Sequence, residues 1–218
     1  MIATLEAPKK PKRVLVIPGQ GIGPECIEAT KKVLAATGVP LEYVEGNLGY
    51  PDAAELFKML GYANPEAVAK ERVAAAKAQA ISNGGKEADY YKFMLKFLKL
   101  EEKASLDAMV LEREKAALQE AAKSNAVLKG ALRTLDDGDQ PSRNVTIRKM
   151  FEQYANMRRC VDMRPDKKAD ILFVRENVED LYAAIEHRLG RNYTQALRHI
   201  TPEGCELICR AAFEACLL

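Results

Sequence analysis

The clearest indication of the fold class is the segment Val14-Leu15-Val16-Ile17-Pro18-Gly19-Gln20-Gly21-Ile22-Gly23-Pro24-Glu25. Its first four residues form a β-branched, apolar run that predicts a short strand, which stops at the proline and the glycine turn. A helical pattern then follows from Pro24 to Ala36. The stretch therefore predicts a strand, a tight loop and a helix in succession.

Further strands and helices alternate along the rest of the chain. Strands are expected at Leu41 to Val44, Asn125 to Leu128 and Ile171 to Val174, and helices from Arg143 to about Tyr154 and after Thr201-Pro202-Glu203. Alternation of this kind is typical of an α/β sheet.

Residues 63 to 123 are rich in Ala, Lys, Glu and Leu and predict two or three helices. Helical spacing places one group of apolar residues on a stripe that we interpret as a packing face, and a second group continues it: Tyr91, Met94, Leu95 and Leu98, then Leu111, Leu118 and Ala121.

Composition limits the classes of function. The chain has 218 residues, 48% of them hydrophobic, and a net charge of +2, which provides no global field for nucleic acid or an anionic membrane. No apolar run approaches the roughly 20 residues that span a bilayer. The 5 cysteines form no C-x-x-C pair, so neither a disulfide framework nor a zinc site is indicated. A reducing compartment is expected, cytoplasmic or alternatively the mitochondrial matrix.

The glycine turn has two interpretations. It lies where a dinucleotide-binding loop can sit, but its spacing is not the G-x-G-x-x-G fingerprint. A plain tight turn between strand and helix is therefore the better interpretation of the residues alone.

The arginines of the C-terminal half suggest an anion site. Asn144 and Arg148 are four residues apart on a predicted helix and share a face, and Arg175 directly follows a predicted strand, where open α/β sheets place their ligands. Together with Arg158, these guanidinium groups would suit a small anion with several carboxylates. From the residues alone, an N-cap at Ser142 and solvated arginines explain the pattern slightly better.

Several blocks of the sequence resemble the isocitrate and isopropylmalate dehydrogenases, which are β-decarboxylating dehydrogenases, and occur in that family's order. The blocks are Ile17 to Glu25, Leu128 to Thr134, Pro141-Ser142-Arg143-Asn144 through Tyr154 to Arg158, Val174 to His187, and Ile200 to Gly204. The resemblance implies an α/β fold of the isocitrate/isopropylmalate dehydrogenase type, truncated and with an inserted helical segment. The expected parts are residues 1–62 in the large α/β domain, 63–123 as the helical insertion, and 124–218 as the substrate segment with the start of the small domain.

The resemblance also implies an activity, the oxidative decarboxylation of isocitrate to 2-oxoglutarate in the tricarboxylic acid cycle. It implies NAD, or alternatively NADP, as the cofactor and Mg²⁺ or Mn²⁺ as the metal. The implied substrate-binding residues are Ser142, Asn144, Arg148, Arg158 and Arg175, the implied acid is Tyr182, and Lys129, Thr134 and Asn144 would lie near the nicotinamide. The Ser142–Asn144 pair favours isocitrate over isopropylmalate. No metal ligand is expected in this chain, because the family's metal-binding aspartates, catalytic lysine and adenine-binding loop belong to a later part of its sequence.

The chain departs from the family pattern at Gln20, Leu135 and Arg159, and in the length of its helical segment. Alternatives to the enzyme therefore stay open: a non-catalytic isocitrate-binding or regulatory subunit, an isopropylmalate-type dehydrogenase, or a structural module that works through the helices. The family implies a dimer, and a homo- or hetero-oligomer is expected. Neither nucleic acid nor a membrane is expected as a partner.

Overall fold

The computed structural model describes residues 10–85, 90–96, 98–132, 143–164, 166 and 168–217. The chain divides between residues 140 and 141 into two compact units, here called the N-terminal and the C-terminal unit. The domain boundaries expected from the sequence stay a prediction.

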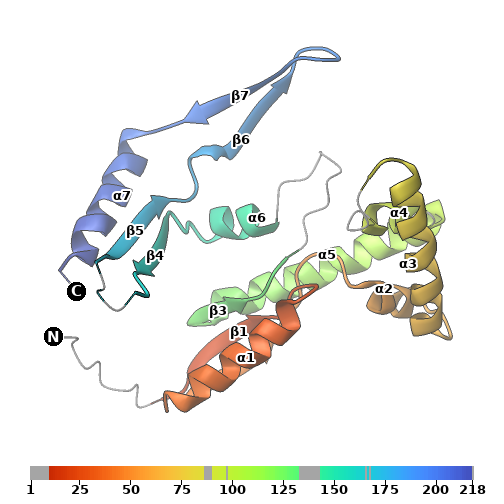
Figure 1. Ribbon diagram of the computed structural model, residues 1–218, viewed down its shortest axis with the longest axis horizontal. Helices are drawn as coiled ribbons and strands as arrows, with labels where there is room; N and C mark the ends of the chain where they lie inside the picture. Colours follow the sequence, from red (N-terminus) through yellow and green to blue (C-terminus); the bar gives the residue numbers. More distant parts are fainter. Residues whose placement is uncertain are drawn as a thin grey trace. The chain divides into compact units, whose positions relative to one another are not determined.

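A small parallel sheet lies in the N-terminal unit (Figure 1). It has three strands in the order β2-β1-β3, and Leu15 at its centre pairs with Val44 on one side and Val127 on the other. The parallel sheet confirms the predicted α/β class. Its elements are β1 (Lys12–Ile17), α1 (Gly23–Ala36), β2 (Leu41–Glu45) and β3 (Ala126–Lys129).

The central strand is buried because its neighbours and helices enclose it. Leu15 and Val16 are fully buried, and Ile27 of α1 is also buried. Pro24 lies in the first turn of α1, where its missing N–H costs nothing. The predicted succession of strand, glycine turn and helix is confirmed.

Four helices form a cluster with its own hydrophobic core (Figure 1). Three of them lie in the segment for which two or three were predicted, whereas the short helix α2 was not predicted. Asp52 caps α2 by accepting a hydrogen bond of 2.8 Å from the backbone N–H of Glu55. The helices are α2 (Ala53–Met59), α3 (Pro65–Ser82), α4 (Tyr90–Lys96) and α5 (Leu100–Lys123).

The predicted packing stripe is right for α4 and partly wrong for α5. Tyr91 and Met94 are buried in the cluster. Leu111, however, is 51% exposed, and the buried face of α5 carries Leu106 and Val110 instead. The stripe does not continue from α4 into α5 because the chain breaks between the two helices, and helical phase is not conserved across a break.

Helix α5 also packs on the sheet. Ala117 is buried, and a Cβ added at Gly46 would press on both Ala117 and Leu15. Near the end of the helix, the Nε of Arg13 on β1 donates a hydrogen bond of 2.7 Å to Glu120. One helix therefore contributes to both the helical core and the sheet core.

Two antiparallel hairpins and two helices make up the C-terminal unit. One hairpin pairs β4 with β5, the other pairs β6 with β7, and α7 packs against β5. The elements are α6 (Arg143–Met150), β4 (Ala155–Val161), β5 (Asp170–Glu176), β6 (Asp180–Arg188), β7 (Thr194–His199) and α7 (Pro202–Ala215).

The sequence predicted α7 and β5 but not the other three strands, and α6 ends earlier than expected. Glu152 has a φ of 48°, a left-handed conformation that terminates the helix before Tyr154. Strands β4, β6 and β7 mix charged and apolar residues on exposed faces, so they show no apolar run.

Burial is unequal between the two units. Among the described residues, Ala211 is the only buried apolar residue of the C-terminal unit, and all the other buried apolar residues belong to the N-terminal unit.

The helices in the described part of the chain are too short or too polar to cross a membrane.

Candidate functional site

Tyr182 on β6 is the centre of the candidate site. The Cζ atom of Arg148, on α6, lies 5.7 Å from the centroid of its ring, and the Cζ atom of Arg175, on β5, lies 5.0 Å from it. The Nη2 of Arg175 also donates a hydrogen bond to the Tyr182 hydroxyl. The structure therefore brings together three of the residues singled out in the sequence, from three different elements.

Arg175 does not occupy the position expected from the sequence. It lies within β5 rather than after it, and β5 pairs antiparallel with β4 instead of ending at the edge of a parallel sheet. The strand is longer than its apolar run because pairing continues to Glu176 opposite Ala155. The site is built on a hairpin and a helix.

Arg158 shares a face of this hairpin with Arg175. Asn156 pairs with Arg175 and Arg158 pairs with Phe173, and side chains two residues apart on a strand point to the same side. The Nε of Arg158 donates a hydrogen bond of 3.1 Å to Oδ1 of Asn156. We call the side of the hairpin that carries Asn156, Arg158 and Arg175 the arginine face.

Arg148, Arg158 and Arg175 differ from other arginines of the C-terminal unit in their ion pairing. Arg159, on the opposite face of β4, is bound to Asp170 by hydrogen bonds of 2.8 and 2.5 Å, and this carboxylate raises the pKa of Arg159. Arg164 and Arg198 are paired with Asp162 and Asp180. In the described part of the chain, no carboxylate forms an ion pair with Arg148, Arg158 or Arg175.

The remaining predicted residues are distributed differently. Asn144 lies one helical turn before Arg148 on α6. Lys129 ends β3 in the N-terminal unit, where its Nζ donates a hydrogen bond of 2.7 Å to the carbonyl of Gly130. Ser142 and Thr134 lie outside the described residues.

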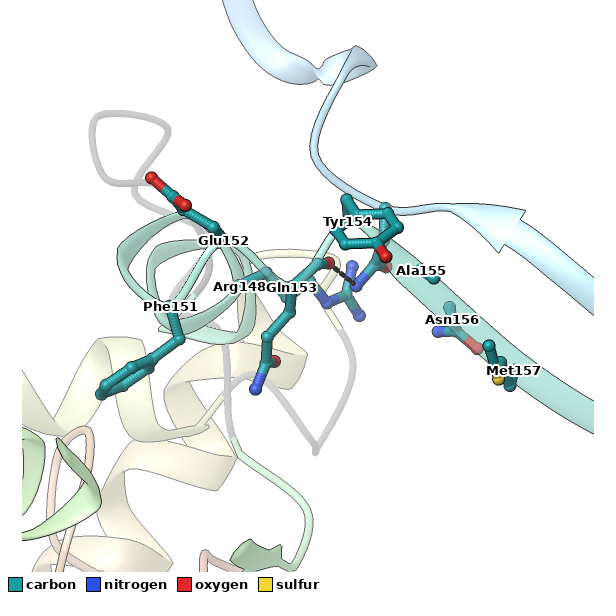
Figure 2. A pocket seen from close by; sticks show the side chains of 9 residues that line it. Arg148, Phe151, Glu152, Gln153, Tyr154, Ala155, Asn156 and Met157 are labelled. Carbon is teal, nitrogen blue, oxygen red and sulfur yellow. Dashed lines mark hydrogen bonds between the residues drawn. The ribbon is translucent and has the colours of Figure 1, made fainter. Parts of the chain in front are cut away.

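An open hollow of about 550 Å³ adjoins Arg148 (Figure 2). It is formed mainly by the turn that connects α6 to β4, together with Asn177 after β5. Asn177 is only 5% exposed, and its Nδ2 donates a hydrogen bond of 3.0 Å to the carbonyl of Gln153. The sequence did not reveal Asn177, because it stands in a polar run that gives no sign of burial.

The glycine turn after β1 is explained by packing within the chain. A Cβ added at Gly19 or at Gly130 would overlap backbone atoms of Ala131 or Pro18, respectively, and the Gln20 N–H donates a hydrogen bond of 2.7 Å to the Ala131 carbonyl. The Gln20 side chain in turn donates to the carbonyls of Leu48 and Tyr50. These contacts support the tight-turn interpretation, and contact with a cofactor stays a prediction.

The described residues do not fit a divalent metal. They include no group of three or more His, Cys, Asp or Glu side chains that could hold one.

Comparison with known proteins identifies the family. Residues 83–217, more than half of the chain, match the family model described as isocitrate/isopropylmalate dehydrogenase. This region begins within the helical segment and includes every described element of the C-terminal unit, from α6 to α7.

Individual relatives agree with this match. The NADP isocitrate dehydrogenase of Thermus thermophilus is 33% identical over 93% of this chain and 32% of its own length. The mitochondrial NAD isocitrate dehydrogenase subunit alpha of Bos taurus is 30% identical over 93% of this chain and 42% of its own. The crystal structure of isocitrate dehydrogenase from Methylococcus capsulatus shares the fold with a TM-score of 0.59, at 24% identity over 94% of this chain and 47% of that one.

The chain thus spans a third to less than half of the length of these relatives. The family match and the shared fold confirm both the resemblance and the expected fold type. The chain belongs to the isocitrate/isopropylmalate dehydrogenase family.

Proposed function

We propose that this chain supplies the isocitrate-binding part of a dehydrogenase that oxidatively decarboxylates isocitrate to 2-oxoglutarate. The observation that carries the proposal is a set of three arginines, Arg148, Arg158 and Arg175, which have no carboxylate partner in the described part of the chain. Arg148 and Arg175 adjoin Tyr182, and Arg158 lies on the arginine face with Arg175. Guanidinium groups bind carboxylates in a bidentate manner, and isocitrate has three carboxylates to offer.

Tyr182 is the proposed acid. When the oxidised substrate loses its β-carboxylate as carbon dioxide, the electron pair of the broken bond remains as an enolate, and the Tyr182 hydroxyl would deliver the proton that completes the product. Arg175 donates to the oxygen of this hydroxyl, so the phenolic proton is left for the substrate. The same guanidinium would stabilise the phenolate after the transfer.

The proposed oxidant is a nicotinamide cofactor, which takes the hydride from the alcohol carbon. The two relatives are named as NADP and NAD enzymes, so both cofactors belong in the assay, with NAD tested first. Lys129, Thr134 and Asn144 are the proposed cofactor contacts. Mg²⁺ or Mn²⁺ remains a family expectation, for which the described residues provide no site.

Isocitrate is proposed over isopropylmalate because Ser142 and Asn144 are polar where the alternative substrate needs an apolar contact.

We propose that the chain forms a homo- or hetero-oligomer, which light scattering can test. The proposed location is the cytoplasm or, alternatively, the mitochondrial matrix. The relative from Bos taurus is itself named as a subunit.

Calorimetric titration with isocitrate, with and without Mg²⁺, tests the proposal. Arg148→Ala should weaken binding about 10- to 100-fold, since a hydrogen bond to a charged group contributes about 1.5–3 kcal/mol. Arg159→Ala is the matched control, because it removes the same charge from the opposite face of the hairpin. Its affinity should stay within about twofold of the original.

The outcomes separate the alternatives. Equal losses in both variants would show that only general positive charge attracts the ligand. A folded chain that does not bind isocitrate would overturn the proposal. Metal-dependent reduction of NAD or NADP by a binding-competent chain would establish the oxidoreductase over the non-catalytic isocitrate-binding subunit.

A further inference from the structure

We infer that Asn177 is a positioning residue, which holds the helix that carries Arg148 in register with the strand that carries Arg175. The inference rests on the proposed function, because it assigns Asn177 a part in aligning the isocitrate-binding arginines. Asn177 is the only buried polar side chain among the described residues, at 5% exposure. Burial of an amide is unfavourable unless hydrogen bonds offset it, so this position needs a structural reason.

A short series of hydrogen bonds supplies that reason. The Asn177 Nδ2 donates to the Gln153 carbonyl at 3.0 Å, and the Gln153 N–H donates to the Arg148 carbonyl at 2.8 Å. Asn177 itself lies two residues after Arg175. The segments that carry the two arginines are therefore connected through the Asn177 side chain and the backbone N–H and carbonyl of one residue, Gln153.

The connection matters because it lies in the turn that joins the helix of Arg148 to β4, beside an open hollow. The turn after α6 includes Glu152 in a left-handed conformation, and it borders the open hollow beside Arg148 (Figure 2). Without the amide, the Gln153 carbonyl would lose this hydrogen bond and the end of α6 could move into the hollow. Arg148 would then leave its place above the Tyr182 ring, whereas Arg175 keeps its own hydrogen bond to that hydroxyl.

Asn177 acts through Gln153 rather than on the ligand. Its Oδ1 is buried and has no hydrogen-bond partner in the described structure, so a bound molecule does not reach it. Asn177 borders the hollow beside Arg148, but its side-chain hydrogen bond is made to the backbone of Gln153.

Asn177→Asp tests the inference, because it keeps the shape of the side chain and removes the donor to Gln153. Asn192→Asp, at an exposed position in the same unit, changes the charge equally and serves as the control. In NMR spectra, the Arg148 Nε–Hε signal should lose its ring-current shift from Tyr182 in Asn177→Asp, while the Arg175 signal keeps its shift. An unchanged Arg148 signal in the folded variant would overturn the inference.

Isocitrate affinity gives a second, coupled readout. Asn177→Asp should weaken binding about tenfold when Arg148 is present. In an Arg148→Ala background, the same substitution should change the affinity by no more than about twofold. Equal losses in both backgrounds would show that Asn177 does not act through Arg148.

Two measurements keep the test independent of folding and of the proposed function. If Asn177→Asp does not fold, the uncharged Asn177→Ala is tested in its place. The second measurement uses the unmodified chain, in which the side-chain amide protons of Asn177 should exchange with solvent more slowly than those of Asn192. Equally rapid exchange would overturn the inference. If the chain does not bind isocitrate but the NMR and exchange results hold, the proposed function fails while the positioning role stands.

Discussion

Tyr182 offers two separable interactions to the arginines around it. Its ring faces the guanidinium groups of Arg148 and Arg175, and its hydroxyl accepts a hydrogen bond from Arg175. Cation–π contacts at exposed sites contribute about 0.5–1 kcal/mol each, so the ring alone should hold much of the arrangement.

Tyr182→Phe should therefore retain isocitrate affinity within about threefold, whereas Tyr182→Ala, which also loses the ring, should bind about tenfold more weakly than the unmodified chain. Calorimetric titration of both variants measures the difference. If the two variants lose affinity equally, the ring has no role in holding the arginines.

For the candidate site, patterns in the residues predicted less than the family resemblance did. Spacing placed Asn144 and Arg148 on one helix, which is confirmed, but it could not show that Arg148 and Arg175 meet at Tyr182. That meeting depends on contacts between separate elements. Asn177 was not found at all, because burial of a polar residue depends on tertiary structure rather than on local pattern.

Among the elements, α5 carries the core of the helical cluster on one side only. Leu106→Ala should lower the free energy of unfolding by about 2–5 kcal/mol, because its side chain is fully buried and the truncation leaves a cavity. Urea unfolding measures the loss. Leu111 is half-exposed on the same helix, so Leu111→Ala should change the free energy of unfolding by less than about 0.5 kcal/mol. Similar losses would mean that the buried face of α5 is misassigned.

The start of α7 should give stability a dependence on pH. Glu179 accepts hydrogen bonds from the Thr201 hydroxyl and, at 3.0 Å, from the Thr201 N–H, and these bonds, chiefly the one from the hydroxyl, lower the pKa of its carboxyl group from the ordinary 4.5. Because the folded-state pKa lies below the unfolded one, the carboxylate stabilises the folded chain above about pH 4.5, and this contribution is lost as the pH falls through the folded-state pKa.

Glu179→Gln should therefore be less stable than the unmodified chain near neutral pH, and the difference should shrink in acid. Urea midpoints measured across this range would show the convergence. A gap that stays constant with pH would exclude ionisation of Glu179 as its cause.

Element prediction succeeded where the pattern was strong. The buried strand β1, the capped helix α7 and the helices of the 63–123 segment follow from apolar runs, caps and composition. Strands β4, β6 and β7 form exposed hairpins in which pairing, rather than an apolar face, defines the strand. Such strands have no strong signature in the sequence.

For the molecule as a whole, the unequal burial of the two units predicts unequal local stability. In hydrogen–deuterium exchange, amides of β4 to β7 should exchange faster than those of β1 and α5, since strands with few buried apolar contacts open more easily. Isocitrate should slow exchange in the C-terminal unit if it binds there. Equal protection of both units would contradict this account of where the chain is stabilised.

The α/β class was predictable for the whole molecule because β1, β2 and β3 alternate with helices. The division between residues 140 and 141 was not, because it depends on contacts and not on a composition boundary.

The double role of α5 restricts how this chain can change length. Between Val110 and Ala117 the helix passes from the helical core to the sheet, so its rotational phase must satisfy both. Deleting one residue there would rotate Ala117 by about 100° away from Gly46, whereas deleting seven would rotate it by only about 20° but draw the two cores about 10 Å closer. Insertions and deletions in the helical segment should therefore accumulate outside this stretch, in the connections that precede α5.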